Sequence, residues 1–375
     1  MNRLRQGLQW LVDRFLDVRV RVLANPRFQR WAARFPLTRP VARRRAAALF
    51  DLSAGFVYTQ VLQACVRLHV IETLADGALT VDEVAARIGL ERSATERLLA
   101  AASSLRLLER RPRGRYGVGI HGASYLGNPI VGRMVEHHAL LYRDLEDPVA
   151  LLRGERADTE LSRFWSYASP RGPGGDEDVA AYSELMARSL ALLAEDILEA
   201  YPFARHRRVL DVGGGQGAFL EAVARHAPHA SLVLFDLPAV AARARTRLTE
   251  VGLSRVEVVG GDVFEDPLPR PADLVSLVRV LHDHDDDDAL RILRAARAAL
   301  APDGVLLVAE PMSETRGAEP MGAAYFGFYL LAMSQGRPRS PAEIRDLLRR
   351  AGFDRVRGRR TRRPMLARLL LARPA

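Results

Sequence analysis

The chain has 375 residues, of which 48% are hydrophobic and 27% are charged. This is enough for two domains that each bury a core, and it excludes a mainly disordered protein. Basic residues exceed acidic ones by ten, and Arg supplies all of them because the sequence contains no Lys. The excess has two interpretations: an Arg-rich coding bias, or attraction to an anionic surface such as nucleic acid or a membrane.

Cysteine content and hydropathy indicate the compartment. The single cysteine, Cys65, excludes an internal disulfide and a Cys-based metal cluster. Charged residues interrupt the first twenty positions, so these positions lack the apolar core of a signal peptide. The longest uncharged stretch, residues 320–336, contains three glycines and is too short to span a bilayer. We therefore expect a cytoplasmic protein that is soluble, or peripheral at the inner membrane.

The first expected element is a basic amphipathic helix over residues 1–24, within an N-terminal extension of residues 1–45. Two interpretations stay open for this helix. It packs on the body of the protein or on a second subunit, or it lies on an anionic membrane surface. The apolar residues at helical spacing are Leu4, Leu8, Leu11, Val12, Phe15, Val18 and Val22.

Residues 46–170 are expected to form a helical domain. A helical pattern runs from Phe50 to Leu74, and Thr80 with Glu83 predicts a capping box at the start of the next helix. A further helix over residues 94–105 and a small hairpin over residues 110–118 complete a winged-helix pattern. Such modules bind DNA in some proteins and serve as dimerisation scaffolds in others.

The would-be recognition helix, residues 95–106, argues against DNA binding. It mixes Glu96 with Arg97 and devotes Leu98 and Leu99 to packing. We therefore expect a homodimerisation domain and no nucleic-acid partner, while a DNA-binding regulator remains the alternative from another functional class.

A cluster of Gly and Pro at residues 168–175 predicts the start of a second domain, residues 171–375. Strand-like runs alternate there with helical ones, which is typical of an α/β fold with a parallel sheet covered by helices on both faces. The expected strands are residues 209–212, 232–235, 256–259, 274–278 and 305–309.

A glycine-rich turn follows the first of these strands and opens the helix at Ala218. It begins with Asp211, and its glycines let the backbone come close to a ligand at a helix N-terminus. Dinucleotides and adenosyl cofactors both use such a turn. The glycines are Gly213, Gly214, Gly215 and Gly217.

Two further strand ends carry acids in register with this turn. Asp236, followed by Leu237, ends the second strand, where a carboxylate can accept both ribose hydroxyls of an adenosine. Asp262 and Phe264, with Val263 between them, end the third strand and offer a carboxylate and a ring to an adenine.

This trio of strand ends resembles the class I S-adenosylmethionine-dependent methyltransferases. The resemblance implies a Rossmann-like domain with a mostly parallel seven-stranded sheet and S-adenosylmethionine as cofactor. It also places Asp211 near the methionine end of that cofactor. Arg279, at the end of the fourth strand, is grouped with the cofactor residues.

The same fourth strand leads into Val280-Leu281-His282-Asp283. A His at the carboxyl end of a strand in an open α/β sheet lies where such sheets bind their ligands. The segment is similar to the catalytic segment of the plant-type O-methyltransferase family, in which the matching His removes the proton of the acceptor hydroxyl. The resemblance implies that Glu310 holds the other imidazole nitrogen, and we group Asp283 with these two as catalytic residues.

Two departures from the family pattern are visible. Residues 336–340 lack the second flanking Glu, and His284 stands where the family usually has Trp. The acidic run 285–288 is interpreted as a helix cap, so no metal is expected.

The family places its acceptor between the methyltransferase domain and the N-terminal helices. Aromatic and apolar residues at the matching positions predict a long, apolar pocket with few polar groups, and hence a lipophilic small-molecule substrate. The candidate pocket residues are His138, Trp165, Met186, Tyr325, Phe326, Tyr329 and Met333, with His137, Phe164, Tyr167, Tyr182 and Phe328 nearby in the sequence.

Residues 49–58 and 324–333 are similar to segments of the carotenoid O-methyltransferases of phototrophic bacteria. This narrower resemblance implies methylation of the tertiary 1-hydroxyl of an acyclic hydroxycarotenoid of the hydroxyneurosporene or demethylspheroidene type. The alternative acceptors are a polyketide, another lipophilic hydroxyl, or a ring carbon of a bacteriochlorophyll precursor.

Overall fold

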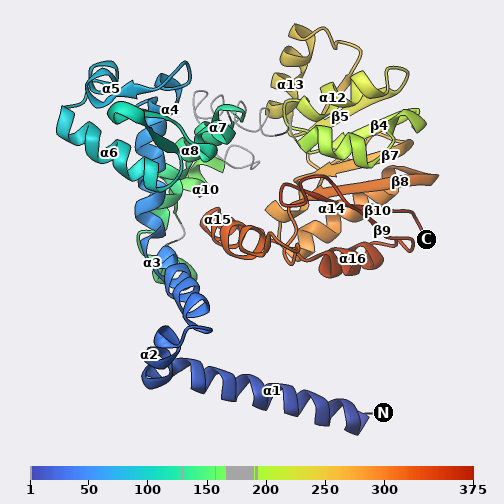
Figure 1. Cartoon of the computed structure of the whole chain (residues 1–375). Helices are drawn as coiled ribbons and strands as arrows, with labels where there is room; N and C mark the ends of the chain where they lie inside the picture. The colour runs from blue at the N-terminus through green and yellow to red at the C-terminus, as the bar shows by residue number, and fades with distance from the viewer. Residues whose placement is uncertain (1, 129, 157, 166–189, 191–192) are drawn as a thin grey trace. The chain divides into compact units, whose positions relative to one another are not determined.

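The computed structural model describes residues 2–128, 130–156, 158–165, 190 and 193–375, with side chains from residue 9 onward. The chain divides into two compact units, Met1–Asn128 and Pro129–Ala375 (Figure 1). The division therefore falls before the boundary predicted at residue 170, which itself lies outside the described residues.

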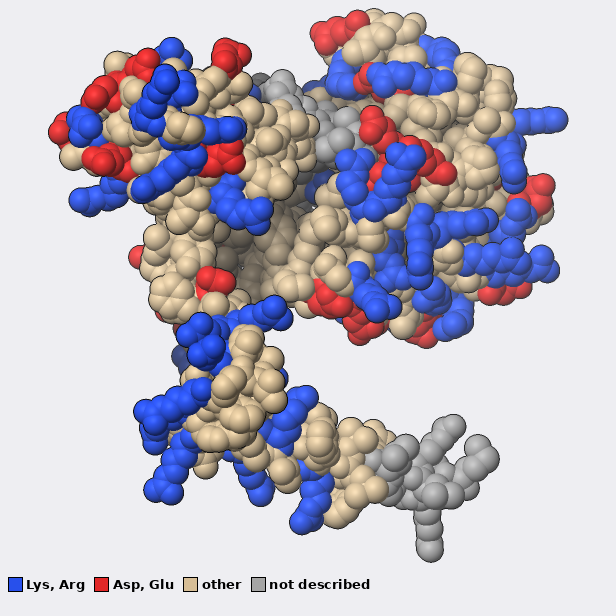
Figure 2. Space-filling view, in the orientation of Figure 1, with Lys and Arg blue, Asp and Glu red and all other residues tan. Residues whose placement is uncertain are grey.

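The first unit opens with three helices in series. α1 (Asn2–Ala24) ends at Asn25, whose side chain caps α2 (Pro26–Arg34), and α3 (Arg39–Arg67) follows a short turn. Figure 2 shows Arg side chains spaced along α1 and α2, with uncharged side chains between them. The helix expected over residues 50–74 is divided, because His69 adopts a left-handed conformation (φ 52°) before α4 (Val70–Thr73) begins.

The rest of the first unit confirms the winged-helix pattern. Thr80 and Glu83 form the predicted capping box. The predicted hairpin is also present, and the three short strands pair in the order β1-β3-β2. A core that includes Cys65, Ile71 and Leu99 holds these elements together. The elements are β1 (Leu79–Thr80), α5 (Val81–Ile88), α6 (Arg92–Ser104), β2 (Leu108–Arg111), the 3₁₀ turn Pro112–Gly114, β3 (Arg115–Val118) and α7 (Ile120–Leu126).

Among the described residues, α3 is long and apolar enough to cross a membrane by length and composition. That is weak evidence by itself, and only 17% of its most apolar window is buried. The C-terminal end of the helix packs Cys65 and Val66 into the first unit, so this end is a core helix of a folded domain.

The second unit begins with helices that belong to it by packing. Leu141, Leu151 and Leu161 form one core cluster with Tyr329 and Leu330, far along the chain. This shared cluster is why the units divide before residue 130. The helices are α8 (Ile130–Asp144), α9 (Pro148–Leu152), α10 (Glu160–Trp165), the π-helical segment η5 (Pro320–Tyr325) and α15 (Phe326–Ala332).

A seven-stranded sheet of order β6-β5-β4-β7-β8-β10-β9 forms the centre of the second unit. The strands β4 to β8 pair in parallel, and β10 is antiparallel to both of its neighbours, which confirms the predicted mostly parallel sheet. The strands are β4 (Arg208–Val212), β5 (Ser231–Asp236), β6 (Glu257–Gly260), β7 (Ala272–Val278), β8 (Leu300–Glu310), β9 (Arg357–Arg359) and β10 (Arg368–Ala372).

Both faces of this sheet are buried, as continuous apolar strands require. Leu210 faces one core, which the helices α14 and α16 complete, and Val209 faces a second core, which α12 and α13 complete. The strand order reverses at β4, and a crevice for ligands opens at such a switch point, beyond the carboxyl ends of the strands. The helices are α12 (Ala218–His226), α13 (Pro238–Glu250), α14 (Asp286–Ala299) and α16 (Pro341–Arg350), with a 3₁₀ turn at Phe203–Arg205.

Candidate active site

A cavity of about 310 Å³ lies at the switch point and takes its wall from the ends of β4, β5, β6 and β7. The glycine turn after β4 forms part of this wall. Its backbone comes close to neighbouring groups at Gly213 and Gly214, because glycine has no Cβ. A Cβ on Gly213 would lie 2.8 Å from Val280, and the φ of Gly213 is +69°. A Cβ on Gly214 would lie 2.6 Å from the Asp211 carboxylate. Gly215 lines the cavity with Gly213, whereas Gly214 and Gly217 support the turn from behind.

Asp211 lies beneath the glycine turn and does not line the cavity. Ser276 Oγ donates a hydrogen bond of 2.6 Å to its Oδ1, and Oδ2 has no partner among the described residues. Burial raises the pKa of Asp211 to about 7. This carboxylate therefore has an unused acceptor next to the turn.

Asp236 is the acid of the cavity wall at the end of β5. It accepts hydrogen bonds of 2.8 Å from the backbone N–H groups of Gly215 and Leu237, so it ties the glycine turn to the second strand. Burial raises the pKa of Asp236 to about 6. A buried carboxylate that faces a cavity is suited to accept the paired hydroxyls of a ribose.

The third strand end completes this half of the wall. Asp262 Oδ1 accepts the backbone N–H of Phe264 at 2.9 Å, and both residues line the cavity with Val263. The Phe264 ring lies edge-on to His284, and the Arg291 guanidinium lies over it at 4.6 Å from its centre. The ring is therefore held in place, which suits it to pack against the face of an adenine.

These features fit S-adenosylmethionine. The glycine turn leaves room that a Cβ would fill, Asp211 keeps an unpaired buried oxygen beneath it, and Asp236 and Asp262 line the wall as acceptors. Bound there, the cofactor supplies a methyl group activated by a sulfonium sulfur. Arg279, with a left-handed φ of 59°, turns the chain from β7 toward the next part of the cavity wall.

His282 lies in a 3₁₀ turn, Leu281–Asp283, directly after β7, and Glu310 ends the neighbouring parallel strand β8. Both side chains are buried, and His282 and Asp283 line the cavity while Glu310 stands behind them. Two parallel strands that end side by side thus bring together residues 28 positions apart in the sequence.

Carboxylates flank both nitrogens of the His282 imidazole. Nε2 lies 3.1 Å from Asp283 Oδ1, and Nδ1 lies 3.8 Å from Glu310 Oε1. The expected hydrogen bond from Nδ1 to Glu310 is not formed: Nδ1 has no partner among the described residues, and Glu310 Oε1 accepts the backbone N–H of His282 at 3.2 Å. Burial lowers the pKa of His282, but the charges of Asp283 and Glu310 outweigh burial and raise the pKa above its usual value.

A second segment, residues 336–340, fixes this turn from the other side. The Arg337 N–H donates to the His282 carbonyl at 3.0 Å. The buried Arg339 donates to the carbonyls of Leu281 at 2.6 Å and His284 at 2.7 Å. In the sequence this segment is notable only for lacking the second Glu, because no local pattern reveals that its Arg residues bind a turn more than fifty positions away.

The acidic run 285–288 takes part in the same contacts. Asp285 stands at the N-cap of α14 without a side-chain cap bond, and it accepts the Gly336 N–H at 3.2 Å instead. Asp286 forms ion pairs with Arg337 and Arg339. The expected capping is therefore replaced by contacts with residues 336–339. Within the described part of the chain, no group of His, Cys and acidic residues suits a metal ion.

Two of the predicted pocket residues, Trp165 and Met333, line the cavity. Four more residues of the predicted set do not line it and form two hydrogen-bonded pairs. His137 Nε2 lies 2.7 Å from the Tyr329 hydroxyl, and His138 Nε2 lies 2.8 Å from the Tyr325 hydroxyl. The aromatic side chains thus satisfy their own polar groups.

Phe326 lies close to the turn Leu281–Asp283, with its ring centre 6.1 Å from that of His282. The remaining predicted pocket residues, Met186, Tyr167 and Tyr182, lie outside the described residues.

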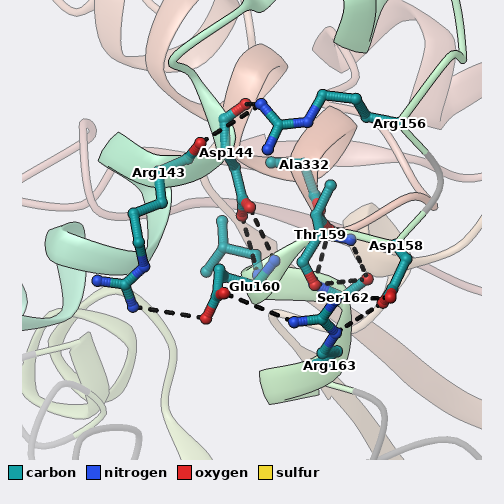
Figure 3. A network of polar contacts seen from close by, with 10 residues as sticks. Arg143, Asp144, Arg156, Asp158, Thr159, Glu160, Ser162, Arg163 and Ala332 are labelled. Carbon is teal, nitrogen blue, oxygen red and sulfur yellow. Dashed lines mark hydrogen bonds and ion pairs between the residues drawn. The ribbon is translucent and has the colours of Figure 1, made fainter.

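A polar network holds the start of α10 (Figure 3). The buried Asp144, at the end of α8, accepts the backbone N–H groups of Glu160 at 2.7 Å and Leu161 at 2.9 Å, and so holds the N-terminus of α10. The Thr159 hydroxyl donates to the Ala332 carbonyl at the end of α15. Because α10 is tied at its start to both helices, Trp165 at its end has a defined place, and its Nε1 donates to Tyr329 at 3.2 Å.

The sheet order, the glycine turn and the acids at three strand ends define a class I methyltransferase. Comparison with family models gives an O-methyltransferase domain over residues 142–354 and an O-methyltransferase dimerisation domain over residues 50–126. The chain belongs to this O-methyltransferase family, and it is an S-adenosylmethionine-dependent O-methyltransferase with a dimerisation domain.

Individual proteins agree with this assignment. The chain is 46% identical to the demethylspheroidene O-methyltransferase of Cereibacter sphaeroides, over 90% of this chain and 89% of the relative. It is 41% identical to the enzyme of that name from Rhodobacter capsulatus, over 94% and 88%. Human N-acetylserotonin methyltransferase, solved in complex with SAM, superposes with a TM-score of 0.73 at 26% identity, covering 88% of this chain and 98% of that one.

Proposed function

We propose that this enzyme methylates the tertiary 1-hydroxyl of an acyclic hydroxycarotenoid, with His282 as the general base. The observation that carries the proposal is the similarity, over most of both chains, to two demethylspheroidene O-methyltransferases.

The polar groups near the cavity favour a lipophilic acceptor. The hydroxyls of Tyr325 and Tyr329 are hydrogen-bonded to His138 and His137. The Trp165 N–H donates a hydrogen bond to Tyr329. A small polar acceptor needs unpaired donors and acceptors on the wall, because a buried polar group without a partner costs about 1 to 3 kcal/mol. An acceptor that offers one hydroxyl on a long hydrocarbon needs few polar partners on the wall, and His282 with Asp283 supplies these partners.

The chemistry of a tertiary alcohol requires a base. Its hydroxyl is too weak an acid to ionise in advance, so the proton must leave as the new C–O bond forms. Two imidazoles line the cavity wall, and a neutral imidazole suits this role because its pKa is close to cellular pH. Of the two, the neighbouring carboxylates raise the pKa of His282, whereas burial lowers the pKa of His284. The carboxylates of Asp283 and Glu310 then stabilise the His282 imidazolium, at 3.1 Å and 3.8 Å from its two nitrogens.

The acceptor is tested by incubating the full-length protein with labelled SAM and single acceptors. We expect label in an acyclic carotenoid with a tertiary 1-hydroxyl, and none in the same carotenoid without that hydroxyl. Mass spectrometry of the product locates the new methyl group. Methylation of N-acetylserotonin in preference to the hydroxycarotenoid would contradict the assigned acceptor.

The base is tested with His282→Ala. We expect turnover to fall by about a hundredfold to ten-thousandfold, the usual contribution of a positioned base. Calorimetry of SAM binding is the control, since the glycine turn and Asp236 remain intact. Near-normal turnover at saturating SAM and acceptor would remove His282 from the role of base.

A further inference from the structure

The N-terminal extension carries all of the excess charge. Residues 1–45 contain twelve Arg and two Asp, a net charge of +10, which equals the net charge of the whole chain. Residues 46–375 are therefore balanced. A coding bias toward Arg acts on the whole sequence and does not by itself explain this concentration. The extension also precedes the dimerisation domain, which begins at residue 50.

The charges of α1 are arranged around an apolar stripe. Leu11, Phe15, Val18 and Val22 repeat at helical spacing, and all four are exposed, Phe15 by 67%. By the same spacing, Arg14 and Arg21 flank this stripe on one side and Arg19 flanks it on the other. Asp13 and Asp17 fall on the opposite face of the helix, which is the arrangement of a helix that lies in a membrane interface.

α2 continues this arrangement. Phe28, Trp31 and Phe35 form a row of rings, with centres 5.7 Å and 5.1 Å apart. At the corner between α1 and α2, Arg21, Arg27 and Arg30 line one shallow surface hollow. Among the described side chains, Arg14 lies 5.2 Å from the centre of the Trp10 ring, and no Arg of the extension forms an ion pair with a carboxylate. No acidic side chain of the described residues therefore competes with an external anion for these guanidinium groups.

We propose that the N-terminal extension docks on the surface of a membrane rich in anionic phospholipids. The Arg side chains bind lipid phosphates, while Phe15, Trp31 and their apolar neighbours enter the boundary of the acyl region. This inference concerns where the enzyme works, and it holds whichever lipophilic hydroxyl is the acceptor.

Two other partners fit the same surface less well. A second copy of the extension carries the same charge, so a symmetric contact between two extensions would bring +10 against +10. A nucleic acid would neutralise the Arg residues but leave Phe15, Val18 and Trp31 in water, since its groove and backbone do not cover an apolar stripe of this length.

The test is sedimentation of the full-length protein with vesicles. We expect binding to vesicles of phosphatidylglycerol and phosphatidylcholine in equal parts, weak binding to phosphatidylcholine alone, and loss of binding at high salt. One Arg near an anionic surface strengthens binding about fivefold, equivalent to about 1 kcal/mol. The quadruple variant R14Q, R21Q, R27Q and R30Q should therefore weaken binding by about a hundredfold or more.

A matched control removes the same charge elsewhere. Arg294, Arg316, Arg349 and Arg350 are exposed side chains of the second unit. Their replacement by Gln should leave vesicle binding within about twofold of the unchanged protein, because this variant keeps the extension intact. Equal loss in both quadruple variants would overturn the proposal, since binding would then follow net charge alone.

A second variant tests the apolar stripe without changing any charge. Phe15→Ser with Trp31→Ser replaces two exposed side chains, so the fold should persist, as circular dichroism will report. We expect vesicle binding to fall at least tenfold. Unchanged vesicle binding, dissociation of a dimer by the Arg variant, or retention on DNA fragments in place of vesicles would each overturn the proposal.

Discussion

Two carboxylates lie on opposite sides of the His282 imidazole, so the protonation of this proposed base depends on its neighbours. Asp283 lines the cavity and Glu310 stands behind it, and each one favours the protonated ring. The His282 imidazole, as the proposed base, must be neutral to accept the proton of the acceptor hydroxyl. The acidic limb of the profile of kcat/KM against pH should therefore lie above about 6.5, the ordinary pKa of His.

Asp283→Asn should move that limb to lower pH. The change removes a negative charge 3.1 Å from Nε2, so the imidazolium loses stabilisation, the pKa of His282 falls, and the neutral form appears at lower pH. The matched control is Asp287→Asn, which removes an exposed acid from the same run. An acidic limb that stays in place in Asp283→Asn, or shifts equally in the control, would mean that another group titrates.

Asp236→Ala should weaken SAM binding by about 1.5 to 3 kcal/mol, the range for hydrogen bonds to a charged group. Calorimetry on the full-length protein measures the change. Asp303, an exposed acid near the start of β8, is the control position, because β8 begins at the opposite edge of the sheet from the cavity. An unchanged affinity would restrict Asp236 to its contacts with Gly215 and Leu237.

At the scale of elements, the parts that could be predicted are those with local signals. The glycine turn, the acids that end β5 and β6, and the His that follows β7 each lie within a few residues of a strand, and parallel strands bring their carboxyl ends to one edge. The contacts of residues 336–340 with the turn that carries His282 had no such local signal. The packing of α8 and α10 against α15 also had no local signal, because the apolar face of a helix does not indicate which helix it packs against.

Gly336 lies where residues 336–340 pack against the turn that carries His282. A Cβ at this position would lie 2.2 Å from the His282 carbonyl oxygen, and the φ of +76° already disfavours any side chain. Gly336→Ala should therefore displace His282 and lower kcat by about tenfold or more, in line with the sensitivity of positioned bases to small shifts. SAM affinity should change little.

Gly327→Ala is the control, because a Cβ there meets nothing within 4 Å and α15 tolerates Ala. A Gly336→Ala enzyme with full turnover would mean that the turn holds His282 without help from residues 336–340. Equal losses of activity in the two variants would point to a general loss of folding, which thermal melting detects.

At the scale of the whole molecule, the excess charge and the dimerisation domain fall on different segments. The Arg excess is confined to residues 1–45, whereas the next stretch of α3 exposes large apolar side chains. Leu52 is 81% exposed and Phe56 is 67% exposed, and both belong to the O-methyltransferase dimerisation domain. An exposed apolar surface of this kind on a folded domain is typical of a subunit interface.

We therefore expect light scattering to return twice the chain mass of 41.5 kDa at micromolar concentration. Leu52→Glu with Phe56→Glu should convert this dimer to a monomer, because burying two carboxylates in each copy of an apolar interface costs more than the contact supplies. Leu37→Glu is the control: Leu37 is equally exposed at 81%, but it precedes the dimerisation domain. A monomeric wild-type protein would contradict the dimer. A double variant that stays dimeric would move the interface away from α3, and dissociation by Leu37→Glu would extend it into the N-terminal extension that we assign to the membrane.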